Sequence, residues 1–86
     1  SRPAFIISRE PDDVKKAVVN HIRRGVTVLQ GQGGYTGESR PVLYVVVPRS
    51  EVVRLKRRVL EADGDAFITI SPAQESLGGW PLRRPD

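Results

Sequence analysis

The stretch that decides the fold runs from Arg24 to Val47 and reads "RGVTVLQGQGGYTGESRPVLYVVV". Both of its ends are apolar and rich in β-branched residues, which favour strands because branched side chains pack well on a pleated surface. Between the ends lie four glycines, Tyr35 and several hydroxyl, amide and charged side chains. A segment of this kind predicts a loop, since glycine adopts backbone conformations that turns need. We therefore expect two strands, Val26–Gln30 and Val42–Val47, joined by a long glycine-rich loop.

A helix is expected on each side of these strands. The first begins at Pro11, which suits a first helical turn, and Gly25 is placed to end it in the left-handed conformation. Its apolar face has helical spacing and comprises Val14, Ala17, Val18, His21 and Ile22. The second helix lies within residues 49–64, and its main apolar stripe comprises Val52, Leu55, Val59 and Ala62.

Two further strands, Ala4–Ser8 and Ala66–Ile70, complete the order β-α-β-β-α-β. This order predicts an α+β fold of the ferredoxin-like class, a four-stranded antiparallel sheet with both helices on one face. The helices share a face because right-handed crossovers place them on the same side of the sheet. We assign residues 1–71 to this domain and residues 72–86 to a C-terminal tail, which either packs on the sheet or is partly disordered.

The expected strands are apolar on both faces, although the helices cover only one. A half-covered antiparallel sheet normally alternates apolar and polar side chains, whereas "AFII" (residues 4–7) and "VLYVVV" (residues 42–47) hardly alternate. Either the tail covers the second face through Leu77, Trp80 and Leu82, or another copy of the chain does. We favour a homo-oligomer because the tail is short and interrupted by glycine.

Composition narrows the functional class. The 86 residues suffice for one domain, and no cysteine is present to form a disulfide or a thiolate metal site. No apolar run approaches the roughly 18 residues that span a bilayer. Because the chain also lacks methionine, we expect it to be part of a longer protein. The net charge of +4, with eleven arginines against three lysines, fits either an anionic partner or an arginine preference of the genome.

Few residues offer catalytic chemistry. His21 is the only histidine, and its place beside Val18 and Ile22 on the first helix favours a role at the edge of the core. No group of metal-ligating side chains and no nucleophile with its base stands out. We therefore expect no enzymatic activity, no metal and no cofactor.

A basic run on the second helix comprises Arg54, Lys56, Arg57 and Arg58. Such a run is typical of a solvated helix face, and it also suits acidic lipid headgroups or nucleic acid. The RNA-binding fold with this topology needs aromatic residues on its first and third strands, where this chain has only Phe5 and Tyr44. We therefore expect no nucleic-acid partner.

The glycine-rich segment is the candidate ligand site. Successive glycines can point several backbone amides at an anion. The segment lacks the lysine of a phosphate-binding loop and leads into a strand instead of the helix of a dinucleotide fingerprint. We predict that a small anionic or nucleotide-like ligand binds where the loop leaves the second strand. The predicted ligand-binding residues are Arg24, Thr27, Gln30, Gly31, Gln32, Gly33, Gly34, Tyr35, Thr36 and Arg40.

Several motifs resemble those of the soluble C-terminal domain of YitT-type bacterial membrane proteins. They are RGVT (residues 24–27), GQGGYTG (31–37), LKRRV (55–59) and DAF (65–67). The resemblance covers residues 4–70 and implies a ferredoxin-like domain of unassigned function, preceded by several transmembrane helices in the same protein. The family's Glu-Val-X-Gly-X-Gly-Phe-like ending is matched only approximately by ESLGGW (75–80). The topology is also similar to that of PII signalling proteins, which bind nucleotides between protomers at the base of a long loop.

Taken with the residues themselves, the resemblance implies a non-catalytic regulatory or ligand-sensing domain. We expect it to be cytoplasmic, homo-oligomeric and attached to the membrane-embedded portion of a protein of the cell membrane. The alternative is a structural oligomerisation module that binds no small molecule.

Overall fold

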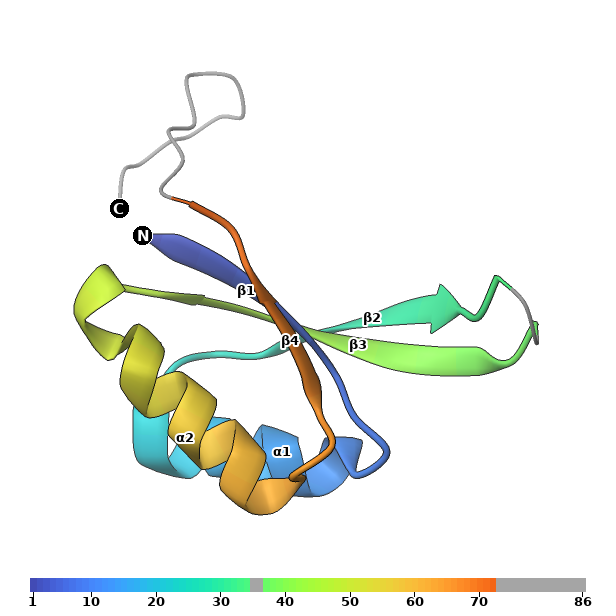
Figure 1. Ribbon diagram of the computed structural model, residues 1–86, viewed down its shortest axis with the longest axis horizontal. Helices are drawn as coiled ribbons and strands as arrows, with labels where there is room; N and C mark the ends of the chain where they lie inside the picture. The colour runs from blue at the N-terminus through green and yellow to red at the C-terminus, as the bar shows by residue number, and fades with distance from the viewer. Residues whose placement is uncertain (35–36, 73–86) are drawn as a thin grey trace.

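A computed structural model describes residues 1–34 and 37–72 (Figure 1). The strands are β1 (Arg2–Ile7), β2 (Thr27–Gln32), β3 (Ser39–Val47) and β4 (Phe67–Ile70). The helices are α1 (Pro11–Ala17), which continues into the π-helical turn η1 (Val18–Ile22), and α2 (Val52–Ala62), which follows the 3-10 turn η2 (Arg49–Glu51). The expected tail contacts of Leu77, Trp80 and Leu82 lie outside the described residues.

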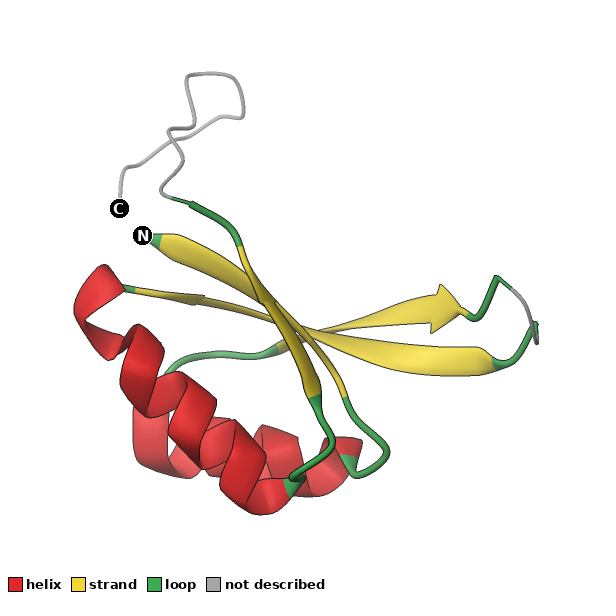
Figure 2. Cartoon of the chain, in the orientation of Figure 1, coloured by secondary structure: helices red, strands yellow, loops and turns green. Residues whose placement is uncertain are grey.

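The sheet has the strand order β2-β3-β1-β4, and every neighbouring pair is antiparallel. Both helices lie on the same side of it (Figure 2). This is the ferredoxin-like α+β arrangement, so the predicted fold class is confirmed. The two central strands, β1 and β3, carry the inward-facing side chains of the core.

The core lies between the sheet and the helices. The buried residues of the central strands alternate along each strand, as the period of a pleated strand requires: Ala4, Ile6, Leu43, Val45 and Val47. The helices contribute Val14, Val18, Ile22, Leu55 and Val59. Val52 and Ala62 pack at the edge of this cluster, so the expected apolar stripe of the second helix is confirmed.

The first helix ends differently from the prediction. The amide of Arg23 donates to the carbonyl oxygen of Val18 at 3.0 Å, which closes the wide turn of η1. Arg23 then adopts the left-handed conformation, with φ at 63°. The prediction that Gly25 ends the helix was therefore wrong, because the wide turn brings the left-handed residue two positions earlier. His21 is exposed and does not lie at the edge of the core.

The glycine-rich segment is also more regular than the sequence suggested. Gly31 pairs with Arg40 and Gln32 pairs with Ser39, so β2 and β3 extend into the expected loop. The connection that remains runs from residue 33 to residue 38. The prediction of a long loop was wrong for these four residues and for Pro41, which pairs with Gln30, because strand pairing satisfies backbone groups that a loop would leave to water.

A carboxylate joins the two loops at the end of the sheet where β1 ends and β4 begins. The Ser8 hydroxyl donates to Oδ2 of Asp63 at 2.6 Å, and the amide of Arg9 donates to the same oxygen at 3.2 Å. The amide of Asp65 donates to Oδ1 at 2.9 Å. The Ser8 hydroxyl and then the Asp65 amide stabilise the charged form of Asp63, which lowers the pKa of this carboxyl below its usual value of 3.8.

This lowered pKa predicts a pH-dependent contribution to stability. Asp63 stabilises the folded state fully above pH 3.8, and this stabilisation is lost as the pH falls through the lower pKa of the folded state. The substitution Asp63→Asn should therefore lower the melting temperature at pH 7 and have progressively less effect as the pH falls below 3.8. Thermal unfolding of both proteins between pH 7 and pH 2.5 measures the difference. Asp65→Asn is the matched control, and a pH-independent effect of Asp63→Asn would contradict the assignment.

Candidate functional site

The tip of the β2–β3 hairpin is held by its own backbone. The amide of Gly33 donates to the carbonyl oxygen of Glu38 at 2.9 Å, and the amide of Gly37 donates to that of Gly33 at 2.8 Å. Nε2 of Gln32 donates to the carbonyl oxygen of Gly37 at 3.0 Å. Gly37 has φ at 75°, where other residues are strained. The Gly33 amide is thus engaged within the hairpin instead of pointing outward.

The predicted ligand-binding residues are spread along the hairpin. Thr27 begins β2 and Gln32 ends it, which separates them by about 16 Å at the usual rise of a strand. Gln30 and Gly31 lie between them, opposite Pro41 and Arg40. Gly33 and Gly34 follow β2, whereas Tyr35 and Thr36 lie outside the described residues. The structure therefore does not bring the described members of the set together around one point.

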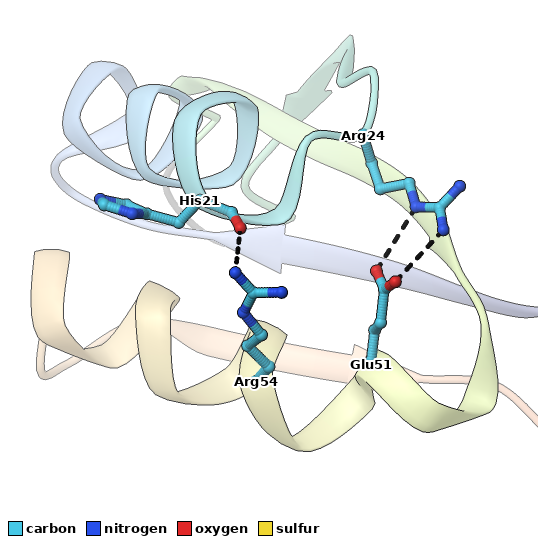
Figure 3. Close-up of polar contacts among 4 residues, drawn as sticks. All are labelled: His21, Arg24, Glu51 and Arg54. Carbon is cyan, nitrogen blue, oxygen red and sulfur yellow. Dashed lines mark hydrogen bonds and ion pairs between the residues drawn. The ribbon is translucent and has the colours of Figure 1, made fainter.

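Arg24 lies at the far end of this arrangement and contacts the helix layer. Its Nε and Nη2 atoms donate to the two carboxylate oxygens of Glu51 at 3.4 and 3.3 Å (Figure 3). Beside it, Nη2 of Arg54 donates to the carbonyl oxygen of His21 at 2.7 Å. Arg54 thus joins the second helix to the C-terminal end of η1, where a cation is favourable, and Arg24 joins the segment after η1 to η2. The sequence carries no signal for either pairing, because the partners are 27 and 33 residues apart.

Arg24 also lines a shallow hollow next to η1. The other residues of this hollow are Val19, Asn20, Arg23 and Gly25. It is open to solvent on the helix side of the molecule, away from the hairpin tip. Arg40, the second predicted cation, instead faces Glu38 on the same strand end, with Nη2 3.7 Å from Oε1. The two predicted arginines therefore do not share one site.

The sheet face opposite the helices exposes apolar side chains from all four strands. Strand alternation and register place these side chains on it: Pro3, Phe5 and Ile7 from β1, Leu29 from β2, Val42, Tyr44 and Val46 from β3, and Phe67 from β4. We call this set the open face. Phe67 is 62% exposed, Leu29 43%, and Phe5 36%. The second apolar face expected from the sequence is thus present.

An aromatic pair lies at the centre of the open face. Phe5 and Tyr44 are directly opposite each other on β1 and β3. Their ring centroids are 5.0 Å apart and their planes are tilted by 50°, a favourable geometry for aromatic contact. The threonines Thr27 and Thr69 flank this pair on the edge strands, and the charged Arg40 lies on the same face only at its outer end, where it pairs with Gly31.

The helix layer and the polar residues offer little chemistry. In the part of the chain that the structure describes, no three His, Cys, Asp or Glu side chains converge as a metal would require. None of the described helices has the length and apolarity needed to cross a bilayer. We take the open face and the hairpin as the two candidate functional features.

Sequence comparison places these features in a group of bacterial proteins. Residues 24–78 match a family described as "Uncharacterized protein conserved in bacteria (DUF2179)". The chain is 42% identical over 78 residues to the UPF0750 membrane protein YpjC of Bacillus subtilis (strain 168), covering 91% of this chain and 27% of that protein. It is 31% identical over 67 residues to YitT, a UPF0750 membrane protein of the same organism, covering 78% of this chain and 24% of YitT. The chain thus spans about a quarter of the length of these two relatives.

Structural comparison agrees with this result. The crystal structure of an uncharacterized DUF2179 protein from Eubacterium ventriosum matches with a TM-score of 0.72 and 25% sequence identity. The match covers 83% of this chain and 99% of that one. The predicted resemblance to YitT-type proteins is confirmed by the sequence relatives, and this structure supports the same fold.

Gly31, near the end of β2, provides a test of the hairpin geometry. A Cβ atom at Gly31 would lie 3.1 Å from Cγ2 of Val42 and 3.2 Å from the carbonyl oxygen of Arg40, whereas one at Gly34 would meet nothing within 4 Å. Because the Arg40 oxygen belongs to the paired strand, it cannot move without disturbing the ladder. We expect Gly31→Ala to lower the free energy of unfolding by about 1–2 kcal/mol, and Gly34→Ala to change it by less than about 0.5 kcal/mol. Urea denaturation measures both, and equal effects would contradict the pairing of Gly31.

Proposed function

The chain belongs to the DUF2179 family of bacterial proteins, and from this premise we propose that it is a non-catalytic domain of a membrane protein that joins subunits through its open face. The observation that carries this proposal is the exposure of neighbouring, uncharged aromatic and aliphatic side chains on a sheet that helices cover from one side only.

The physical argument concerns the cost of leaving this face in water. Burying apolar surface contributes about 25 cal/mol per Å², and monomeric proteins seldom expose a contiguous patch of several large apolar side chains. The Phe5–Tyr44 pair adds rigid aromatic surface of the kind that anchors protein interfaces. The uncharged centre of the open face also fits, since charged residues are depleted at interface cores. A second copy of the same face supplies a matching apolar surface.

Membrane attachment makes such association easier. The relatives YpjC and YitT are named membrane proteins, and most of their length lies outside the region matched here. We propose that the corresponding remainder of this protein is embedded in the cell membrane and holds the domain on the cytoplasmic side. Confinement to one membrane raises the effective concentration of the domains, so that a weak interface suffices.

The non-catalytic assignment rests on the side chains available. His21 is exposed, and it is its backbone carbonyl that accepts the hydrogen bond from Arg54. Asp63, whose carboxyl has a lowered pKa, is engaged with Ser8, Arg9 and Asp65 in a link between loops. These contacts support structural roles for both residues.

Regulation by a small anionic ligand at the hairpin is the second candidate. It is favoured by the projection of the hairpin away from the helices (Figure 1) and by the exposed side chains of Gln30, Gln32 and Arg40 along it. Such a ligand would bind between neighbouring copies, because the predicted residues do not converge within one chain.

Association through the open face predicts a mass above that of one chain. At micromolar concentration, light scattering should give a mass well above 9.5 kDa. The double variant Phe5→Ser/Phe67→Ser should shift the mass toward that value, because it removes two large apolar groups from the open face. Val53→Ser is the matched control, since Val53 is 72% exposed on α2. A wild-type mass of 9.5 kDa at every concentration would contradict the proposal.

The ligand candidate has its own test. The purified protein is screened by thermal shift against nucleotides, cyclic dinucleotides and inorganic phosphate, because a ligand that binds the folded state raises the melting temperature. If one of them binds, Arg40→Ala should weaken the affinity measured by calorimetry about tenfold or more through the lost charge-assisted contact. Arg49→Ala, which removes a cation at η2, is the control. No shift at millimolar concentrations would leave the open face as the functional feature.

A further inference from the structure

The outer part of the β2–β3 hairpin is a two-stranded ribbon. β1 pairs with β3 only from Val47 to Leu43, whereas β2 continues to pair with β3 as far as Ser39. The ribbon consists of residues 29–32 and 39–42 and projects from the sheet (Figure 1). A two-stranded ribbon alone in water is marginally stable, and a third strand stabilises it.

The direction of each backbone group on the ribbon follows from one hydrogen bond. In an antiparallel pair, hydrogen-bonded and non-hydrogen-bonded residue pairs alternate. Because the amide of Gly33 donates to Glu38, the amides of Gly31 and Leu29 also point toward β3. The amides and carbonyls of Val28, Gln30 and Gln32 therefore point outward from the edge of the sheet that β2 forms.

The two edges of the ribbon differ in the residues that point outward from them. On the β3 edge, the outward positions are Ser39 and Pro41, and proline has no amide to offer another strand. Natural sheets protect their edges in this way, or with charges and bulges. The β2 edge has neither proline nor charge, and Val28 and Leu29 are each 43% exposed along it. The ribbon is thus closed to strand addition on one side and open on the other.

The opposite edge of the sheet is less suited to pairing. β4 has four residues, and the bond from the Ser71 amide to the Pro3 carbonyl sets its phase. By the same alternation, only Ile68 and Ile70 point outward there. By contrast, β2 offers three outward residues at alternate positions: Val28, Gln30 and Gln32.

We propose that β2 pairs antiparallel with β2 of a second copy of the chain, about a two-fold axis at Gln30. This is the one register in which all three outward residues meet outward residues. Gln30 faces Gln30 of the partner subunit, and Val28 faces Gln32 of the partner subunit in both directions. Each of these three pairs exchanges two backbone hydrogen bonds.

The side chains fit this register. Leu29 faces Gly31 of the partner subunit, where the missing Cβ leaves room for the leucine. No like charges meet, because β2 is uncharged from Thr27 to Gln32. Paired in this way, the two sheets become continuous with their helices on the same side, which also joins their open faces. The pairing itself uses only the β2 edge and does not depend on the open face binding anything.

Amide exchange of the wild-type protein tests the pairing without a mutation. We expect hydrogen exchange at Val28, Gln30 and Gln32, followed by NMR, to slow at least about tenfold between dilute and concentrated protein, because pairing protects these amides. The amides of Leu29 and Gly31 should exchange slowly throughout, which shows that the ribbon stays folded. Rapid exchange of the three outward amides at every concentration overturns the proposal. Equal protection at every dilution also overturns it, since that result indicates a cover within one chain.

Two substitutions at Gln30 separate backbone pairing from side-chain effects. Gln30→Pro removes the outward amide without touching the ladder to β3, whereas Gln30→Val keeps the amide and suits a strand. Sedimentation equilibrium should show association weakened at least about tenfold in the proline variant, since the ring blocks the central pair, and preserved in the valine variant. Unchanged association of Gln30→Pro, with Leu29 and Gly31 still protected, overturns the proposal.

The same measurements distinguish the edge from the open face. Phe5→Ser/Phe67→Ser should leave the concentration-dependent protection of Gln30 unchanged if the edge pairs independently. Loss of that protection in this variant overturns the proposal that the β2 edge pairs independently of the open face. A mass that falls with the phenylalanine variant but not with Gln30→Pro supports the open face alone and excludes the edge.

Discussion

The packing of both helices on one side of the sheet is the constraint on which the rest of the structure depends. Right-handed connections leave no other arrangement for this strand order, and Leu55 and Val59 of α2 meet Ile6, Leu43 and Val45 in a single buried layer. One sheet face is thereby satisfied and the other is left uncovered. In a chain whose central strands are apolar on both sides, this constraint produces the open face directly.

In the hairpin, backbone pairing overrides the tendency of glycine to favour loops. Four glycines between two strands suggested a loop, but Gly31 has strand geometry and lies close to Val42 and Arg40 of the opposite strand. At Gly31 the lack of a side chain allows the two strands to approach closely, while at Gly37 it permits a positive φ. The same residue type thus has two physical roles within one hairpin, and only the register separates them.

The predicted ligand-binding residues are more widely separated in the structure than their sequence suggested. Arg24, Arg40 and the glycines are neighbours in the sequence, but a strand moves successive residues apart by about 3.3 Å each. Arg24 is instead occupied with Glu51 and lies beside the Arg54–His21 contact. Those pairings hold η1 and the segment after it against α2 and η2, which no local pattern indicates because they join residues that are far apart in the sequence.

Local patterns were sufficient for the order of the elements, the buried stripe of α2, the apolar character of both sheet faces and the resemblance to YitT-type proteins, because each depends on residue type at short spacing. The end of the first helix, the length of the hairpin and the partners of the arginines depended on tertiary structure. A wide turn placed the left-handed residue at Arg23 instead of Gly25. Strand register placed Pro41 on the β3 edge of the ribbon, which proline protects, and Gln30 on the unprotected β2 edge. Register is a relation between two segments, so the sequence of either segment alone does not contain it.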